Sequence, residues 1–349
     1  MTILNRKNVD TTKQPIFLGE PLGLQRFDKY KYPQFFNLFN KQLEQFWRPE
    51  EISLSLDRGQ FNDLQKHEKF IFTKNLLFQT MLDSVVSRGV PTFTKHVTNP
   101  ELEICLNTWG FFENIHSYSY SYIIKNVYSN PSKIFDQCLE DSEILARADS
   151  VTKAYDDLNE AKFDLKEKIY LSLISVNILE AIRFYVSFVC AFAFGENKLM
   201  VGNADIIKLI KRDESVHLTI TQTILNILKT EEQEGFLDVI ESRKDVVIKM
   251  FTDAVNEEKA WATYLFQHGS ILGLNDTILH KYIEWLADSR LSNLGFSKIY
   301  NTKNPIGGWL DAWTNSSNVQ VAPQESEITS YLKASNFNDM DSLDLSEFA

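Results

Sequence analysis

The segment WGFFENIHSYSYSY at residues 109–122 places an acid, an imidazole and a phenol among aromatic side chains. Trp109, Glu113, His116 and Tyr120 follow one another at intervals of 4, 3 and 4 residues. Side chains at this spacing lie on one face of an α-helix. The segment therefore predicts a helix that presents a carboxylate, a ring nitrogen able to bind a metal, and a phenol on the same side.

A second acid–histidine pair repeats this spacing. Glu214 and His217 stand three residues apart in RDESVHL at 212–218, as Glu113 and His116 do. The chain has only six histidines, and random placement would give roughly 0.4 such pairs, so two of them suggest a metal site.

Two further acids lie inside apolar helical stretches. Asp83 is part of NLLFQTMLDSVVSR, and Glu180 is part of LSLISVNILEAIRFYVSF. One interpretation pairs each acid with a nearby arginine, Arg88 or Arg183. An unpaired buried carboxylate is unfavourable, however, and four helices with inward acids need a shared counter-charge. Two divalent metal ions would neutralise the four carboxylates.

The combination of ligand types narrows the choice of metal. Oxygen ligands with one imidazole per ion suit iron or manganese, whereas structural zinc is bound by cysteine or by more histidines. A glutamate from each of two helices, together with Glu-x-x-His from each of two others, is the ligand set of ferritin-like di-iron and di-manganese bundles. Here an aspartate, Asp83, replaces one of the single glutamates.

Composition limits the class of protein. The chain has 349 residues, is 44% hydrophobic and carries a net charge of −11, which indicates a globular protein and argues against a nucleic-acid partner. The three cysteines are widely spaced and fit neither a disulfide framework nor a zinc site. The N-terminal MTILNRKNVDTTK lacks a signal-peptide core, and the longest apolar stretch, 184–194, is too short to span a bilayer. We therefore expect a cytoplasmic protein with no membrane segment.

Proline positions and apolar periodicity predict an all-α fold. No proline lies between 132 and 304, and alternating strand patterns are nearly absent. The helical pattern predicts helices at about 31–46, 61–88, 101–128, 132–160, 165–194, 204–228, 240–270 and 275–295. We expect an N-terminal extension at 1–30, a ferritin-like helical domain with additional helices at 31–316, and a disordered, acidic C-terminal tail at 317–349.

The chain resembles the radical-generating β subunit of class I ribonucleotide reductase, most closely the tyrosyl-radical class Ia type. The resemblance covers nearly the whole length and rests on six blocks in order. These blocks are FWRPEE at 46–51, MLDS at 81–84, ENIHSYSY at 113–120, VNILEAIRFYVSF at 176–188, RDESVHL at 212–218 and NVQVAPQESEITSY at 318–331.

The resemblance implies a di-iron-oxo centre with two Fe ions per chain, although manganese or a mixed Mn/Fe pair would also be compatible. It assigns the first metal to Asp83, Glu113 and His116, and the second to Glu180, Glu214 and His217, with Glu113 and Glu214 bridging. Reaction of the metals with O₂ would oxidise Tyr120 to a stable radical. Phe184, Phe188 and Ile210 match the apolar lining of that radical, although they would equally serve as core residues.

The same resemblance implies partners and a route for the radical. Trp47 and Asp213 match a relay from His116, and Tyr331 in the tail matches the residue that passes the radical to the large (α) subunit, where ribonucleotides are reduced. The family is homodimeric and docks on the large subunit through its tail. The corresponding tail residues here would be Glu325, Leu343, Leu345 and Phe348.

Three residues depart from the family pattern: Phe112, Tyr118 and Tyr122 stand where a small residue, a basic residue and a histidine are usual. None of them is an expected ligand. Two rival interpretations are another ferritin-like di-metal oxidase or monooxygenase, and an iron-storage or purely structural helical protein. Trp47, Tyr120 and the tail with Tyr331 argue against the first. Storage proteins are shorter, self-assemble into shells and need no partner-binding tail, which argues against the second.

Overall fold

The computed structural model describes residues 5–314. Every regular element in this part of the chain is helical, apart from two isolated bridge pairs, Phe17–Val97 and Ile271–Leu274. The elements in order are η1 (Thr11–Lys13), α1 (Pro33–Glu44), η2 (Pro49–Glu51), α2 (Asp57–Asp63), α3 (Lys66–Thr94), α4 (Pro100–Val127), α5 (Pro131–Glu140), α6 (Ser142–Asn159), α7 (Leu165–Ile178), η3 (Leu179–Arg183), α8 (Tyr185–Glu196), α9 (Val201–Thr230), η4 (Glu232–Glu234), α10 (Leu237–Ser242), α11 (Lys244–Phe266), α12 (Asp276–Asn293) and α13 (Trp309–Thr314). The all-α expectation is confirmed, and the expected tail at 317–349 lies outside the described residues.

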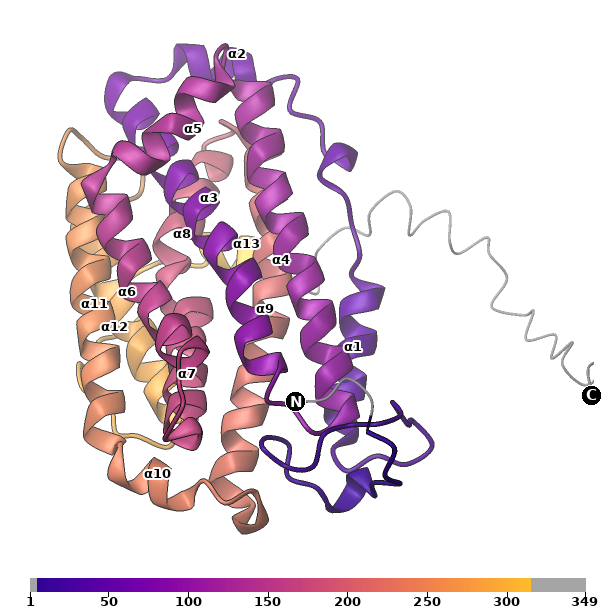
Figure 1. Cartoon of the computed structure of the whole chain (residues 1–349). Helices are drawn as coiled ribbons and strands as arrows, with labels where there is room; N and C mark the ends of the chain where they lie inside the picture. The colour runs from indigo at the N-terminus through magenta and orange to yellow at the C-terminus, as the bar shows by residue number, and fades with distance from the viewer. Residues whose placement is uncertain (1–4, 315–349) are drawn as a thin grey trace, which may run out of the picture.

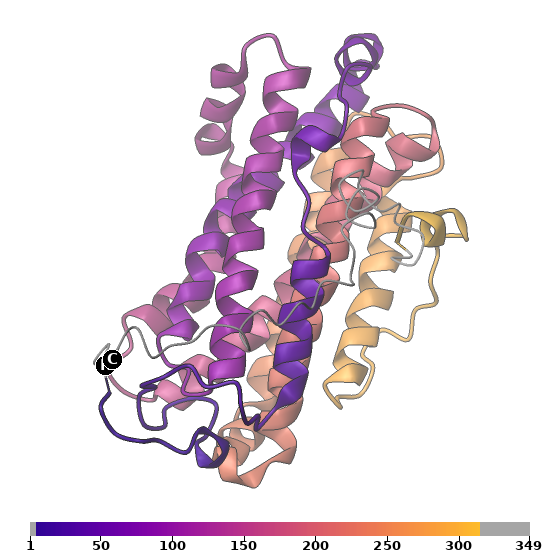
Figure 2. The ribbon, with the colours of Figure 1, turned by 90° about the vertical axis from the view of Figure 1, so that its right-hand side faces the viewer.

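Four long helical rods surround the centre of the molecule (Figure 1). They are α3, α4, α9 and the rod made by α7, η3 and α8. α3 packs along α4, α4 contacts α9, α9 packs along α8, and α8 returns to α3, so the ring is closed. α12 and α13 flank this bundle on the side away from α4 (Figure 2).

The starts of two helices follow their capping residues. Asn99 accepts a hydrogen bond from the backbone N–H of Leu102, and Pro100 occupies the first position of α4. Asn130 caps α5 in the same way, with Pro131 first. A side-chain oxygen at this position binds a free N–H of the first turn, and proline has no N–H to leave unpaired. Both starts agree with the sequence pattern.

Three predicted helices are each divided in the structure. The predicted helix at 240–270 falls on α10, which ends at Ser242, and α11, which ends at Phe266. The predicted helix at 132–160 is two helices, because Asp141 ends α5 and caps α6. The predicted helix at 61–88 is the short α2 followed by α3, which continues through Pro91 to Thr94. Pro91 interrupts only the last turn of α3, where the loss of one backbone hydrogen bond disturbs little of the helix.

The rod formed by α7, η3 and α8 is long and apolar enough to cross a membrane by length and composition, over Leu165–Glu196. Its most apolar window is completely buried inside the fold, as in the core helix of a soluble protein. Within it, the five residues of η3 form a π-helical turn, and the N–H of Phe184 bonds the carbonyl of Leu179 five residues earlier. Such turns occur often at functional sites.

Candidate metal centre

The six acids and histidines singled out by the sequence converge at the centre of the four rods, and all are buried. Asp83 comes from α3, Glu113 and His116 from α4, Glu180 from η3, and Glu214 and His217 from α9. They form two overlapping groups, each with ligand atoms within 4.8 Å of one another. The first is Asp83, Glu113, His116 and Glu214, and the second is Glu113, Glu180, Glu214 and His217.

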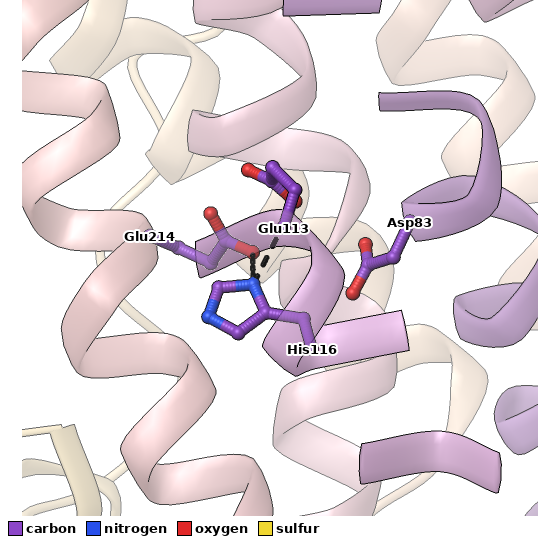
Figure 3. A group of neighbouring side chains, drawn as sticks. All are labelled: Asp83, Glu113, His116 and Glu214. Atoms are coloured by element: carbon purple, nitrogen blue, oxygen red, sulfur yellow. Dashed lines mark ion pairs between the residues drawn. The ribbon is translucent and has the colours of Figure 1, made fainter. Parts of the chain in front are cut away.

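Figure 3 shows the first group: Asp83 and Glu214 reach in from opposite sides, with Glu113 and His116 between them. His116 Nδ1 lies 3.1 Å from Glu214 Oε1 and 3.6 Å from Glu113 Oε2. His217 Nδ1 lies 2.8 Å from Glu214 Oε2 and 3.1 Å from Glu113 Oε1. Glu113 and Glu214 therefore contact both histidines and belong to both groups.

The electrostatics of the cluster divide its carboxylates into two kinds. Burial raises the pKa of Asp83 and of Glu180 well above the ordinary value, and neighbouring carboxylates raise both further. Burial alone would also raise the pKa of Glu214, but His116 and His217 outweigh it and lower that pKa. Positive charge from the two histidines thus satisfies Glu214 but leaves Asp83 and Glu180 uncompensated.

The arginines that could have neutralised these acids lie elsewhere. Arg183 Nη1 forms an ion pair with Glu257 Oε2 at 2.7 Å, and Arg88 is exposed. Among the described residues no ion pair joins either arginine to Asp83 or Glu180. The simple acid–arginine interpretation of these two positions was therefore wrong, because tertiary packing directs the side chain of Arg183 to α11.

Unpartnered polar atoms show that the cluster fits metal ions. Both oxygens of Asp83, both of Glu180 and one each of Glu113 and Glu214 have no hydrogen-bond partner within residues 5–314. Buried polar atoms normally have partners, so this concentration of exceptions calls for a bound group. Four carboxylates and two imidazoles at this spacing suit two divalent ions of the iron or manganese type.

Tyr120 is completely buried, one helical turn after His116. Burial raises the pKa of its phenol well above the ordinary value, and the charge of Asp83 raises that pKa further. Phe184, Phe188 and Ile210 are buried in the same core, and the rings of Phe184 and Phe188 stack with centroids 5.6 Å apart. The phenol is thus kept neutral beside the cluster and away from water.

One carboxylate oxygen joins the cluster to a buried tryptophan on the segment after α1. Asp213 Oδ2 accepts a hydrogen bond from Trp47 Nε1 at 2.7 Å and lies 3.1 Å from His116 Nε2. Arg212 Nε lies 3.4 Å from the other oxygen, Asp213 Oδ1. Trp47 itself is almost completely buried. The three residues predicted as a relay are therefore in contact.

Trp109 is a further contact residue to which the sequence assigned no role. Its Nε1 donates a hydrogen bond to Glu113 Oε1 at 2.6 Å, and its ring stacks on His217 with centroids 4.9 Å apart. In the sequence, the position of Trp109 on the same helical stripe as Glu113 and His116 was the feature that could have predicted its contact with Glu113. The predicted residues of the tail, Glu325, Tyr331, Leu343, Leu345 and Phe348, lie outside the described residues.

The sequence and the fold both match known proteins of one family. Residues 25–305 match the family model described as ribonucleotide reductase, small chain. The chain is 46% identical to the ribonucleoside-diphosphate reductase subunit beta of Buchnera aphidicola subsp. Schizaphis graminum, covering 95% of this chain and 94% of the relative. It is 42% identical to ribonucleoside-diphosphate reductase 1 subunit beta of Escherichia coli O157:H7, covering 99% of each. A solved ribonucleotide reductase R2 subunit from Clostridium botulinum superposes with a TM-score of 0.82 at 31% identity, covering 90% of this chain and 98% of that one.

Proposed function

The chain belongs to the ribonucleotide reductase small-chain family, and from this premise we propose that it generates a radical on Tyr120 for a large subunit that reduces ribonucleoside diphosphates. The observation that carries the proposal is the pair of overlapping ligand groups that share Glu113 and Glu214. A site of this composition can hold two metal ions in contact with common carboxylates. The buried phenol of Tyr120 lies beside it.

In this proposal Asp83, Glu113 and His116 would hold one ion and Glu180, Glu214 and His217 the other, with Glu113 and Glu214 as the ligands common to both groups. When bound, the metal pair would use O₂ as the source of oxidising power. Two Fe ions per chain are our assignment, and a manganese or mixed Mn/Fe pair fits the same ligand types.

The protein's own groups determine what happens at the phenol. Tyr120 must lose one electron and its hydroxyl proton to become a neutral radical. Asp83, the carboxyl whose charge acts most strongly on the Tyr120 phenol, is suited to accept that proton. The buried rings of Phe184 and Phe188 and the side chain of Ile210 would exclude water and prolong the radical's lifetime.

Transfer toward the large subunit would follow the hydrogen-bonded residues His116, Asp213 and Trp47. Asp213 Oδ2 contacts both partners, so it can hold the imidazole in one orientation and exchange a proton with the indole. From there the radical would pass through Tyr331 in the tail. Glu325, Leu343, Leu345 and Phe348 would contribute to docking on the large subunit. We further propose that the working form is a cytoplasmic homodimer.

Tyr120→Phe tests the proposal directly, because it removes the oxidisable hydroxyl and keeps the ring. We expect the variant to bind two metals per chain, measured by elemental analysis, and to lose the tyrosyl signal in electron paramagnetic resonance after addition of Fe(II) and O₂. Reduction of ribonucleoside diphosphates with the large subunit should be lost as well.

Two results would contradict this assignment. An undiminished tyrosyl signal in Tyr120→Phe would move the radical to another residue, such as Tyr118 or Tyr122. A wild-type protein that binds two metals and oxidises added substrates, yet never forms a tyrosyl radical, would favour the rival assignment as a ferritin-like oxidase or monooxygenase.

A further inference from the structure

A pocket of about 390 Å³ lies between α3 and α6. Its wall is formed by Val85, Arg88, Gly89, Pro91, Thr92, Thr152, Tyr155, Asp156 and Asn159. Arg88 and Asp156 are exposed, whereas Tyr155 is only 4% exposed and is the one aromatic residue of the wall. The pocket therefore has charged groups at its mouth and a tyrosine ring in its interior.

The phenol of Tyr155 is buried beneath the pocket. Its hydroxyl is buried and has no hydrogen-bond partner within the part of the chain that the structure describes. Burial raises the pKa of Tyr155 well above the ordinary value, and the charges of Glu180 and Glu113 raise it further, as expected for a phenol near the cluster. An unpartnered buried hydroxyl is unusual in a folded protein.

Three aromatic rings separate the pocket from the ligands. The Tyr155 and Phe93 rings have centroids 6.1 Å apart, and those of Phe93 and Trp109 are 6.4 Å apart. Trp109 in turn donates a hydrogen bond to Glu113. Along this path the side chains between the pocket and the ligand cluster are the uncharged rings of Tyr155, Phe93 and Trp109.

Gly89 lets the backbone of α3 approach the outermost ring. A Cβ at this position would lie 2.5 Å from Cζ of Tyr155, closer than real Cβ atoms come to a neighbour. Gly89 is thus required for packing, even though glycine is a poor helix former. The consequence is that the Tyr155 ring of α6 packs directly on the backbone of α3 at the inner end of the pocket.

We propose that this pocket is the entrance through which small uncharged molecules such as O₂ reach the metal centre, and that the Tyr155 ring is the barrier they pass. The choice of O₂ rests on the proposed function. Charged solutes are excluded because leaving water for an aromatic interior is costly for an ion. Buried groups of this kind open through fluctuations of the ring and its neighbours.

Nitric oxide is a suitable probe, because it is small, uncharged and changes the absorption of Fe(II) on binding. We expect Tyr155→Ala to raise its association rate with the anaerobic, Fe(II)-loaded protein by about tenfold, since removing the ring lowers the barrier. Thr152→Trp, which fills the half-buried outer wall, should slow association several-fold. Tyr170→Ala is the matched control, because it removes an equally buried ring from a different pocket and should leave the rate unchanged.

Equal acceleration by Tyr155→Ala and Tyr170→Ala, or an unchanged rate in Thr152→Trp, would overturn the proposal in favour of general loosening or another route. A measurement on the metal-free protein separates failure of the entrance proposal from failure of the proposed function. The fluorescence lifetime component that disappears in Trp109→Phe belongs to Trp109. Dissolved O₂ should quench this component faster in Tyr155→Ala than in wild type. Unchanged quenching there would reject the entrance whether or not the protein binds metal.

Discussion

At the residue scale, Asp83 and Glu180 are carboxyl groups that the metal-free fold holds at the expense of stability. Burial and neighbouring carboxylates raise the pKa of both. A carboxyl with a raised folded pKa stabilises the fold below its unfolded pKa, and this contribution is lost as the pH rises through the folded pKa. Burial lowers the pKa of His116 and His217, but Glu214 and the other neighbouring carboxylates together outweigh it and raise both pKa values. The two histidines therefore also make the fold less stable as the pH rises above 6.5.

We therefore expect the metal-free protein to become less stable as the pH rises from about 5 to about 8. Glu180→Gln should weaken this dependence and raise the free energy of unfolding at pH 8 by about 1 kcal/mol or more, because it removes a buried carboxylate that has no hydrogen-bond partner among the described residues of the metal-free fold. Urea denaturation with a chelator present measures it, and exposed Glu160→Gln is the control. Identical pH profiles for wild type and Glu180→Gln would show that the Glu180 carboxyl is not a source of the pH dependence. Saturating metal should reverse the order of stability, because wild type alone keeps the full ligand set.

Asp213 allows a second test at this scale, because one of its oxygens serves two partners. Asp213→Asn keeps the shape of the side chain but loses the charge and the capacity to take up a proton. We expect near-normal metal content and a Tyr120 radical signal, with turnover on the large subunit lowered at least about 10²-fold, as for loss of a proton-transfer group. Asp205→Asn on the same helix is the control. Full turnover by Asp213→Asn would exclude the carboxylate from the relay.

At the element scale, the π-helical turn η3 determines where Glu180 points. An extra residue in one turn shifts the helical phase of everything that follows, including Phe184 and Phe188. The sequence predicted one regular helix at 165–194, because no glycine or proline lies in Leu179–Arg183. The distortion is stabilised by tertiary contacts of the rod with α9, α11 and α12, and apolar periodicity carries no information about those contacts.

Asp141 shows the same limit at the α5–α6 junction, where the sequence predicted a continuous helix. Its Oδ1 accepts hydrogen bonds from the N–H groups of Glu143 and Ile144. Its Oδ2 lies 2.5 Å from Lys74 Nζ and accepts a hydrogen bond from the Tyr264 hydroxyl at 3.0 Å. One carboxylate thus ends a helix, begins the next and ties both to α3 and α11.

Asp141→Ala should lower the free energy of unfolding by about 2 kcal/mol, since it removes a cap and leaves Lys74 and Tyr264 without their acceptor. The metal content and the Tyr120 radical should be unchanged, because the junction lies outside the ligand cluster. Asp136→Ala on α5 is the matched control and should cost less than about 0.5 kcal/mol. Thermal or urea unfolding measures the difference. Equal stability of the two variants would show that helix propensity alone sets the break.

At the scale of the whole molecule, helical periodicity was sufficient to predict an all-α fold and to place Glu113 and His116 on one stripe, because those relations are local. Contacts between rods were not predictable in this way. The Trp47–Asp213 hydrogen bond joins residues 166 positions apart, and the sequence suggested it only through family resemblance. The i,i+4 spacing placed Trp109 beside Glu113, but the stacking of Trp109 on His217 and the contacts of Tyr155 with Phe93 and Gly89 depend on how the helices pack, so no spacing rule identified them.

An aromatic face on the outside of the bundle bears on the proposed homodimer. It consists of Leu43, Phe46, Phe111 and Tyr118, whose exposed fractions are 53%, 40%, 52% and 47%. The rings of Phe46 and Phe111 stack there, with centroids 6.2 Å apart. These residues come from α4 and from α1 and the segment after it, two helices that pack together. Exposed apolar patches of this kind usually mark interaction sites, and a two-fold axis would place the same patch on both chains against itself.

Phe111→Glu should therefore weaken the homodimer by at least about 100-fold, because a buried, unpaired carboxylate at the interface costs several kcal/mol. Sedimentation across a concentration series measures the effect. Phe163→Glu is the matched control, because Phe163 is 81% exposed between α6 and α7 and lies on another part of the surface. Truncation from Leu343 onward should show the opposite pattern, with an intact dimer but no binding to the large subunit. If Phe111→Glu instead remains dimeric and loses the large subunit, the aromatic face belongs to that partner, and the homodimer must use another surface.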